Sequence, residues 1–439
     1  MGRNKYFQEF IKYSTLNVLG MIGLSCYILA DTFFISKGLG ANGLTALNLA
    51  IPIYSFIHGS GLMLGMGSAT KYSILKSQKE YHKTNIIFTN TIYLALIISS
   101  VFVLIGIFLS RTLTTAIGAD TVVFGMTNTY LKVILLFAPF FIMNDVLICF
   151  VRNDGNPKLS MYAMLGGSIS NVILDYIFIF PFKMGIFGAV FATGFAPIIS
   201  MMILSPHWLK KKNEFHFIKS KLNLFMTQTT LSLGFPSLIT EVSSGIVIIV
   251  FNTIILNLAG NVGVAAYGVI ANLSLVVVAI YTGIAQGIQP LISKAFGYND
   301  TKNVKRILHY ALIMMFAISC IVYFVIFFFT DPISRIFNSE NNLQLQEIAT
   351  IGLKLYFIAA LFVGFNVIIS MFFTSTEKAI PAHIISLLRG LLLIIPIAFL
   401  FSSIWGITGA WLSFPATEII VTILGLLLYF KFNKINTLQ

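Results

Sequence analysis

Five acidic residues lie inside long apolar stretches of this sequence. They are Asp31, Asp145, Asp175, Glu241 and Glu418. An ionised carboxylate costs about 2.5–3.5 kcal/mol at the centre of a membrane helix on insertion scales, so such residues usually face a polar cavity and mark ion or proton paths. A carboxyl group can change its charge by taking up H⁺, or it can bind Na⁺ together with neutral oxygen atoms. These acids predict proton or cation binding, and we expect no catalytic residue.

Other polar residues extend this set. Asn171 and Asp175 are four residues apart, so on a helix they share one face, although an Asn there could simply form a hydrogen bond between helices. For Asp145, a buried pair with Arg or Lys is an equal alternative to a functional role. For Glu418, a structural role is favoured. The candidates for an additional polar cavity are Asn144, Asp145, Tyr27, Tyr130 and Glu418.

The segments that must position these residues are apolar enough to cross a membrane. Of the 439 residues, 57% are hydrophobic and 10% are charged, where about 25% charged is usual in soluble domains. This composition excludes a soluble globular enzyme and a disordered chain. The runs are continuously apolar, which favours helices over the alternating strands of a barrel. We expect an all-α polytopic fold with twelve spans, near 13–37, 45–74, 85–110, 122–150, 158–181, 186–208, 226–256, 263–292, 303–329, 346–375, 379–400 and 405–430.

The basic residues indicate the orientation of these spans. With the N-terminus inside, 21 of the 28 Lys and Arg residues fall on inner connections, 6 fall on the outer side, and Arg389 lies within a helix. This positive-inside bias accounts for the net charge of +13, so we expect no nucleic-acid partner. We predict a multi-pass protein of the cell inner membrane with both termini cytoplasmic. The basic start of the chain is interpreted as a retained first helix, and the three Cys residues give no disulfide or zinc pattern.

A repeat of about 220 residues divides the chain. The segment Gly185–Ala189 is echoed by Gly406–Ala410 after 221 residues, and the Gly61-x-x-x-Gly65 pattern is echoed at Gly283 and Gly287 after 222. Each half has six spans, so the halves are parallel repeats, an architecture of transporters that rock two lobes around a binding site. We predict an N-lobe over 1–208, an inter-lobe loop over 209–225 and a C-lobe over 226–439.

Several stretches resemble the MATE (multidrug and toxic compound extrusion) family of the MOP superfamily. They lie in the family's order along nearly the whole chain: 30–35 (ADTFFI) with Leu39-Gly40, 152–158 (RNDGNPK), 171–180 (NVILDYIFIF), Gly234-Phe235-Pro236 with Glu241, and 283–290 (GIAQGIQP).

The resemblance implies two six-helix lobes around a central cavity and export of cationic, amphipathic drugs against inward H⁺ or Na⁺. Asp31, Asn171 and Asp175 match the family's amino-terminal-lobe cation site, which implies a possible Na⁺ ligand set there if Na⁺ is the coupling ion. Glu241 matches a functional acid of the NorM-like branch. Helix 346–375 lacks that branch's Asp, so the pattern is closer to the DinF-like branch, and we expect H⁺ rather than Na⁺.

Two other functions are weighed against drug export. A flippase for lipid-linked oligosaccharides belongs to the same superfamily, but it would be expected to carry several basic residues in its cavity, whereas the spans contain mostly acids. A membrane enzyme would need a reactive cluster on sizeable loops, and none is found; a phosphate-binding loop is also absent from the sequence. We therefore expect no enzyme activity, no cofactor apart from the coupling ion, lipid and small cationic drugs as partners, and a monomer.

Overall fold

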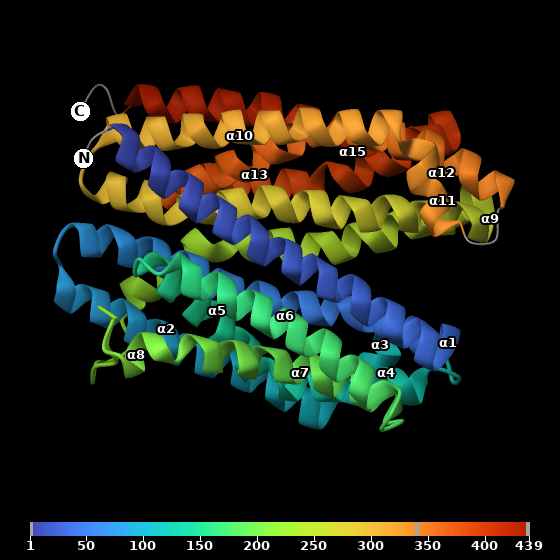
Figure 1. The fold of residues 1–439 in the computed structure, drawn as a ribbon, viewed down its shortest axis with the longest axis horizontal. Helices are drawn as coiled ribbons and strands as arrows, with labels where there is room; N and C mark the ends of the chain where they lie inside the picture. The colour runs from blue at the N-terminus through green and yellow to red at the C-terminus, as the bar shows by residue number, and fades with distance from the viewer. Residues whose placement is uncertain (1–2, 339–341, 436–439) are drawn as a thin grey trace.

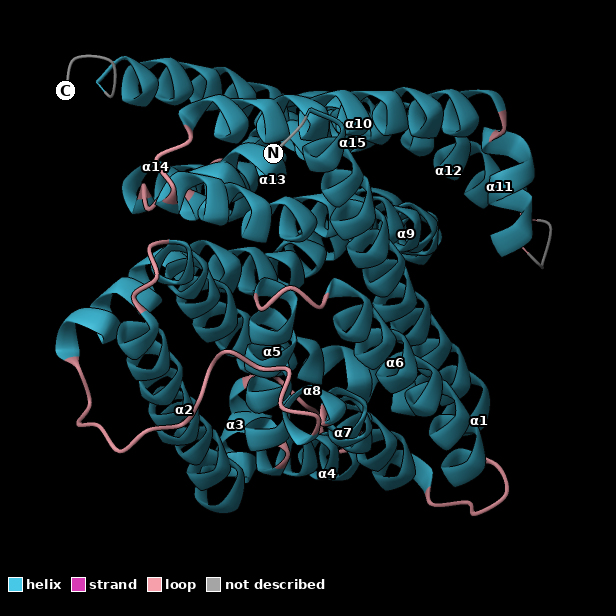
Figure 2. Cartoon of the chain, turned by 60° about the vertical axis from the view of Figure 1, so that its left-hand side comes forward, coloured by secondary structure: helices cyan, strands magenta, loops and turns pink. Residues whose placement is uncertain are grey.

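The structure is a computed structural model that describes residues 3–338 and 342–435. Over this part of the chain it consists of helices and connecting loops, without strands (Figure 2). The elements before the connection 210–223 are α1 (Arg3–Ser77), α2 (Tyr81–Leu104), the π-turn η1 (Ile105–Leu109), α3 (Ser110–Ala116), α4 (Phe124–Leu136), α5 (Ala138–Asn153), α6 (Pro157–Ile179), α7 (Gly185–Leu204) and α8 (Pro206–Leu209). Those after it are α9 (Leu224–Gly297), α10 (Thr301–Phe328), α11 (Thr330–Phe337), α12 (Leu343–Tyr356), η2 (Phe357–Ala359), α13 (Ala360–Ser375), α14 (Ala379–Leu387), η3 (Leu388–Leu392) and α15 (Ile394–Ile435).

Three helices are too long to be single spans, and each breaks at one glycine. α1 breaks at Gly40, α9 at Gly260 and α15 at Gly406, where φ is 68°, 62° and 58°. A residue with a side chain rarely adopts such a positive φ, so glycine is the residue that allows each reversal. Nine helical stretches of the described chain are apolar and long enough to span a membrane, when the bent pair α4–α5 counts as one. Division at the three glycines gives twelve spans.

The glycine breaks repeat along the chain. Gly40 and Gly260 are 220 residues apart, and Gly185, which opens α7 with a φ of 62°, is 221 residues before Gly406. The bend of 48° between α4 and α5 occurs beside Pro139, because proline cannot donate the helical hydrogen bond to the preceding turn.

The helices form two bundles, each with its own apolar core (Figure 1). α2–α8 and the second half of α1 make the N-terminal bundle, and most of α9 with α10–α15 makes the C-terminal bundle. The first half of α1 crosses from one to the other: Phe10 lies in the core of the C-terminal bundle. Met226, at the start of α9, lies in the core of the N-terminal bundle. The bundles are therefore interlocked by an exchange of helix ends.

Both termini lie at one end of the molecule, together with the connection 210–223 (Figure 1). We call this the termini end, and the opposite end, with Gly40 and Gly260, the far end.

Candidate functional site

Three of the predicted polar residues meet in the core of the N-terminal bundle. Asp31 comes from α1, and Asn171 and Asp175 come from successive turns of α6. Asp31 is 6% exposed, and the other two are fully buried. The carboxyl groups of Asp31 and Asp175 lie within hydrogen-bonding reach of each other. The expected meeting of these residues is therefore observed, which makes a two-carboxyl site possible.

Small residues bring α1 and α6 close enough for this meeting. A Cβ atom at Gly20 would lie 2.9 Å from the sulfur of Met164, and one at Gly23 would collide with the side chain of Leu165. Close helix approach through glycine is typical of membrane bundles. The two glycines thus fix the separation of the helices that carry the acids.

Asn171 orients Asp175. In the amide orientation that satisfies both of its polar atoms, Asn171 donates to Asp175 Oδ2 at 3.1 Å and accepts from the backbone N–H of Thr193 at 3.3 Å. One oxygen of each acid, Asp31 Oδ1 and Asp175 Oδ1, is buried without a hydrogen-bond partner. Among the described residues, no Lys, Arg or His side chain forms an ion pair with either acid. Two oxygens are therefore free to take a proton or a cation.

Two tyrosines border this site. Tyr130 of α4 is 4% exposed and interacts with both acids and with Thr193. The hydroxyl of Tyr27 lies 2.9 Å from that of Tyr54 and separates the acid pair from a neighbouring cavity. Thr193 and Tyr54 were missed from the sequence, because a Thr or Tyr in an apolar helix carries no signal of its own.

The neighbouring cavity, of about 80 Å³, contains Asn144 and Asp145 in its wall. Asp145 Oδ2 lies 2.9 Å from His58 Nδ1, an ion-pair distance. The Arg or Lys partner considered for Asp145 is therefore wrong, since the basic group brought to it is a histidine of α1. Asn144 Oδ1 is buried and has no partner.

Glu241 and Glu418 lie apart from the acid pair. Glu241 lines a second cavity of about 60 Å³ with Arg389 and Asn366. Glu418 is 1% exposed, pairs with Arg389 Nε at 2.7 Å, and accepts from Asn366 Nδ2 at 2.7 Å. This contact set supports the structural interpretation of Glu418, because both of its oxygens are occupied.

The bundles contact each other through a polar layer toward the termini end. The fully buried Arg152 donates through Nη1 to Asn17 at 2.6 Å and to Gln286 at 2.8 Å. Nearer the surface, Lys71 of α1 pairs with Glu377 at 2.7 Å. The layer closes the termini end of the interface. The RNDGNPK stretch marked Arg152 in the sequence, but gave no sign of its partners in the other half.

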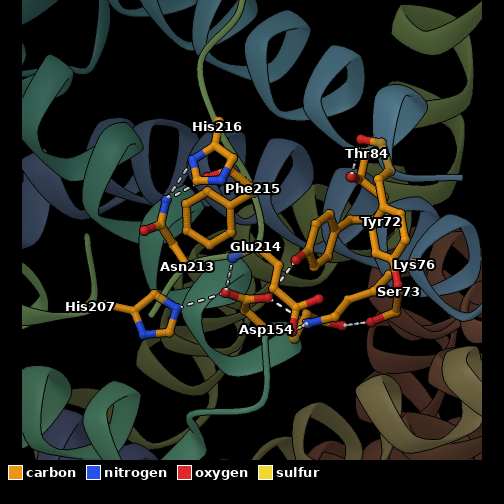
Figure 3. A network of polar contacts seen from close by, with 12 residues as sticks. Tyr72, Ser73, Lys76, Thr84, Asp154, His207, Asn213, Glu214, Phe215 and His216 are labelled. Atoms are coloured by element: carbon orange, nitrogen blue, oxygen red, sulfur yellow. Dashed lines mark hydrogen bonds and ion pairs between the residues drawn. The ribbon is translucent and has the colours of Figure 1, made fainter. Parts of the chain in front are cut away.

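A second network, centred on Asp154, ties down the connection between the bundles (Figure 3). Asp154 Oδ1 accepts from Tyr72 at 2.5 Å and Lys76 at 2.6 Å. Its Oδ2 lies 2.8 Å from His207 Nε2 and accepts from the backbone N–H of Glu214 at 2.9 Å. Burial raises the pKa of Asp154, but contacts with His207, Lys76 and Tyr72 outweigh it and hold the pKa below its ordinary value of 3.8.

This network predicts a pH-dependent loss of stability. We expect Asp154→Asn to cost about 3–5 kcal/mol at neutral pH, the range for breaking a buried pair. Because the folded-state pKa is depressed, the stabilisation is present above the unfolded-state pKa of about 3.9 and is lost as pH falls through the folded value. The melting temperatures of wild type and variant in detergent should therefore differ by a constant amount down to about pH 4 and converge below it.

The matched control is Glu80→Gln, which removes an exposed carboxylate paired with Lys83 at 3.3 Å. Exposed pairs contribute about 0–1 kcal/mol, so its melting temperature should scarcely change. Convergence of wild type and Asp154→Asn already near pH 6 would contradict the assignment.

Comparisons with known proteins cover nearly the whole chain. A model of the MatE family matches residues 18–177 and 236–400. The chain is 26% identical over 434 residues to the multidrug export protein MepA of Staphylococcus saprophyticus, covering 98% of this chain and 94% of the relative. It is 24% identical over 430 residues, with the same coverage, to MepA of Staphylococcus aureus strain MSSA476.

Solved structures share the fold. One, described as the outward-facing conformation of a multidrug resistance MATE family transporter of the MOP superfamily, superposes with a TM-score of 0.89 at 21% identity. Another, a MOP superfamily transporter from Pyrococcus furiosus described as having a binding pocket of reverse polarity, gives 0.88 at 21% identity. Each match covers 95% of this chain and 94% of the other. The likeness supports two lobes of six spans each.

Proposed function

The chain belongs to the MatE family of multi-pass membrane transporters, and from this premise we propose that it exports amphipathic organic cations in exchange for protons. The observation that carries the proposal is the pair of buried carboxyl groups, Asp31 and Asp175, in contact and without a basic partner. Two touching carboxyl groups do not readily ionise together, so a pair of this kind holds and releases one proton. The multidrug export relatives support organic cations as cargo.

Protons are favoured over Na⁺ by the hydrogen bonds of Asn171. Its amide oxygen accepts from Thr193 and its nitrogen donates to Asp175. The amide is thereby committed to the protein, and the two free carboxyl oxygens suffice for a proton but are few for a metal ion. Among the described residues, no group of three or more His, Cys, Asp and Glu side chains could hold a metal.

The termini end is proposed to face the cytoplasm, following the basic residues there. Lys210, Lys211 and Lys212 lie in the connection at that end. In this orientation the Arg152 layer closes the cytoplasmic side, and the cavities must communicate with the exterior in this conformation and with the cytoplasm after the bundles rock. Protonation of the acid pair would favour one arrangement and cargo the other, as alternating access requires.

Efflux from proteoliposomes tests the function. Vesicles loaded with ethidium are given a pH gradient alone, a Na⁺ gradient alone, or ATP without a gradient, and vesicles without protein serve as the control. We expect the pH gradient to drive efflux and the other two conditions to match the control. Efflux with Na⁺ alone would overturn the proton assignment. Failure of every gradient would overturn drug export, and lipid-linked oligosaccharides would then be the cargo to test.

A further inference from the structure

The pair formed by His58 and Asp145 is a second ionisable site in the N-terminal bundle. It lies in the cavity beside Tyr27, and neither Asp31 nor Asp175 lines that cavity. The two side chains are 13% and 8% exposed, and their atoms Nδ1 and Oδ2 are 2.9 Å apart. The proton exchange proposed for the acid pair makes no use of them.

The cavity wall suits an organic cation. The ring of Tyr54 stacks on His58 with centroids 5.9 Å apart and planes 5° apart, and its edge-to-face contact with Phe141 spans 5.5 Å. Aromatic faces attract cations, and apolar pockets with a few convergent polar groups bind small molecules. The buried, unpartnered Asn144 Oδ1 in the same wall is an acceptor ready for a donor on such a ligand.

The charges around His58 leave Asp145 as the anion for that ligand. Asp145 comes from α5, and Arg152 of the same helix lines the cavity but is engaged by Asn17 and Gln286. Glu241 of α9 interacts electrostatically with His58 and Asp145 from across the bundle interface. The remaining titratable groups of the wall are Tyr27, Tyr54 and Cys149; α6 and α7 contribute only uncharged residues.

We propose that organic cations and the proton of His58 compete for Asp145, so that binding one monovalent cation releases one proton from this pair. With His58 protonated, the pair is neutral, and a bound cation would leave a net positive charge in a buried cavity. With His58 neutral, the cation takes the place of the imidazolium beside Asp145, and the charge balances: imidazolium·carboxylate plus cation gives imidazole, carboxylate·cation and H⁺. Burial of a net charge is unfavourable, so the exchange is favoured.

The inference rests on the proposed export of cations, and it makes the cargo site itself proton-linked, in addition to Asp31 and Asp175. Such a site would release cargo on the acidic side of the membrane, because protonation of His58 there reoccupies Asp145. It also selects positively charged cargo over neutral analogues of the same shape.

Binding of ethidium to the purified protein tests this site by fluorescence titration over a series of pH values. For wild type we expect Kd to fall about tenfold per pH unit while His58 titrates, as linkage to one proton requires. In weakly buffered solution a pH indicator should register about one proton released per ethidium bound in that range. The proton count needs no variant, so it stands even where a substitution impairs folding.

Two variants locate the effect. His58→Gln should bind ethidium with little dependence on pH and release no proton, while Asp145→Asn should weaken binding at least about tenfold at high pH, since the counter-charge is gone. The matched controls are His309→Gln on the exposed side of α10 and Asp120→Asn at the far end, which should bind like wild type. An unchanged pH slope in His58→Gln, or unchanged affinity in Asp145→Asn, would overturn the proposal.

The outcome is separable from that of the efflux assay. Proton-linked ethidium binding that depends on His58, without efflux under any gradient, would leave this site standing and overturn the exporter. Efflux driven by the pH gradient with proton-independent binding would do the opposite.

Discussion

Replacement of Asp31 by Asn is expected to reduce efflux driven by a pH gradient to the rate of vesicles without protein. The amide is close to the carboxyl group in size, so α1 and α6 should stay in contact across Gly20 and Gly23. It cannot take up and release a proton, however, and Asp175 would lose the neighbour with which it shares one. Coupling needs a group whose charge changes as it loads, so loss of the titration removes the driving force while the protein still folds.

Ethidium efflux from proteoliposomes measures this effect, and the melting temperature in detergent shows whether folding is retained. Asp120→Asn is the matched control: the same substitution on an exposed acid whose Oδ1 accepts from the N–H groups of Val122 and Val123, both at 3.0 Å. Asn can accept the same bonds, so this variant should transport like wild type. Normal efflux in a folded Asp31→Asn protein would falsify the role of the acid pair.

Gly234→Ala is expected to force the two bundles apart. A Cβ atom at this position of α9 would collide with the carbonyl oxygen and Cα of Met63 on α1, and one at Gly67 would collide with the carbonyl of Thr230. The obstacle is backbone, which cannot rotate away as a side chain can. Overpacking typically costs about 1–3 kcal/mol and occasionally more. We therefore expect a clear drop in melting temperature and a loss of efflux.

The control for this prediction lies on the same helix. A Cβ atom at Gly268 of α9 would meet no atom within 4 Å. Ala is favoured over Gly in a helix by about 0.5–1 kcal/mol, so Gly268→Ala should leave the melting temperature equal or slightly higher. If Gly234→Ala melts with Gly268→Ala, the bundles are not held at this distance and the packing argument fails.

The spans and their acids could be predicted because the responsible physics is local. A run of apolar residues long enough for the membrane forms a helix whatever its neighbours, and a carboxylate within it is conspicuous. The four residues between Asn171 and Asp175 place both on one helix face for the same reason. The motifs at Gly185 and Gly406 also mark real geometry, since both residues adopt a positive φ at the far end.

Partners across the bundle could not be predicted, because they depend on which helices become neighbours. Asp145 was weighed against Arg and Lys, yet it meets His58, whose type alone indicated nothing. Gly61 and Gly283 occupy equivalent places in the repeat but serve different contacts: Gly61 admits Asp145 within one bundle, whereas Gly283 admits Val18 of α1 at the interface between bundles.

The sequence by itself determined that this is a helical membrane protein with two similar halves and a small set of buried acids, because hydropathy, helix periodicity and glycine conformation act over a few residues. Only the tertiary structure decided that Phe10 packs in the second bundle and Met226 in the first, that Arg152 bridges the two, and that one acid pair lacks a basic partner while the acids Asp145 and Glu418 have one. These contacts join residues far apart in the chain, and their free energies are gained only when the helices pack together.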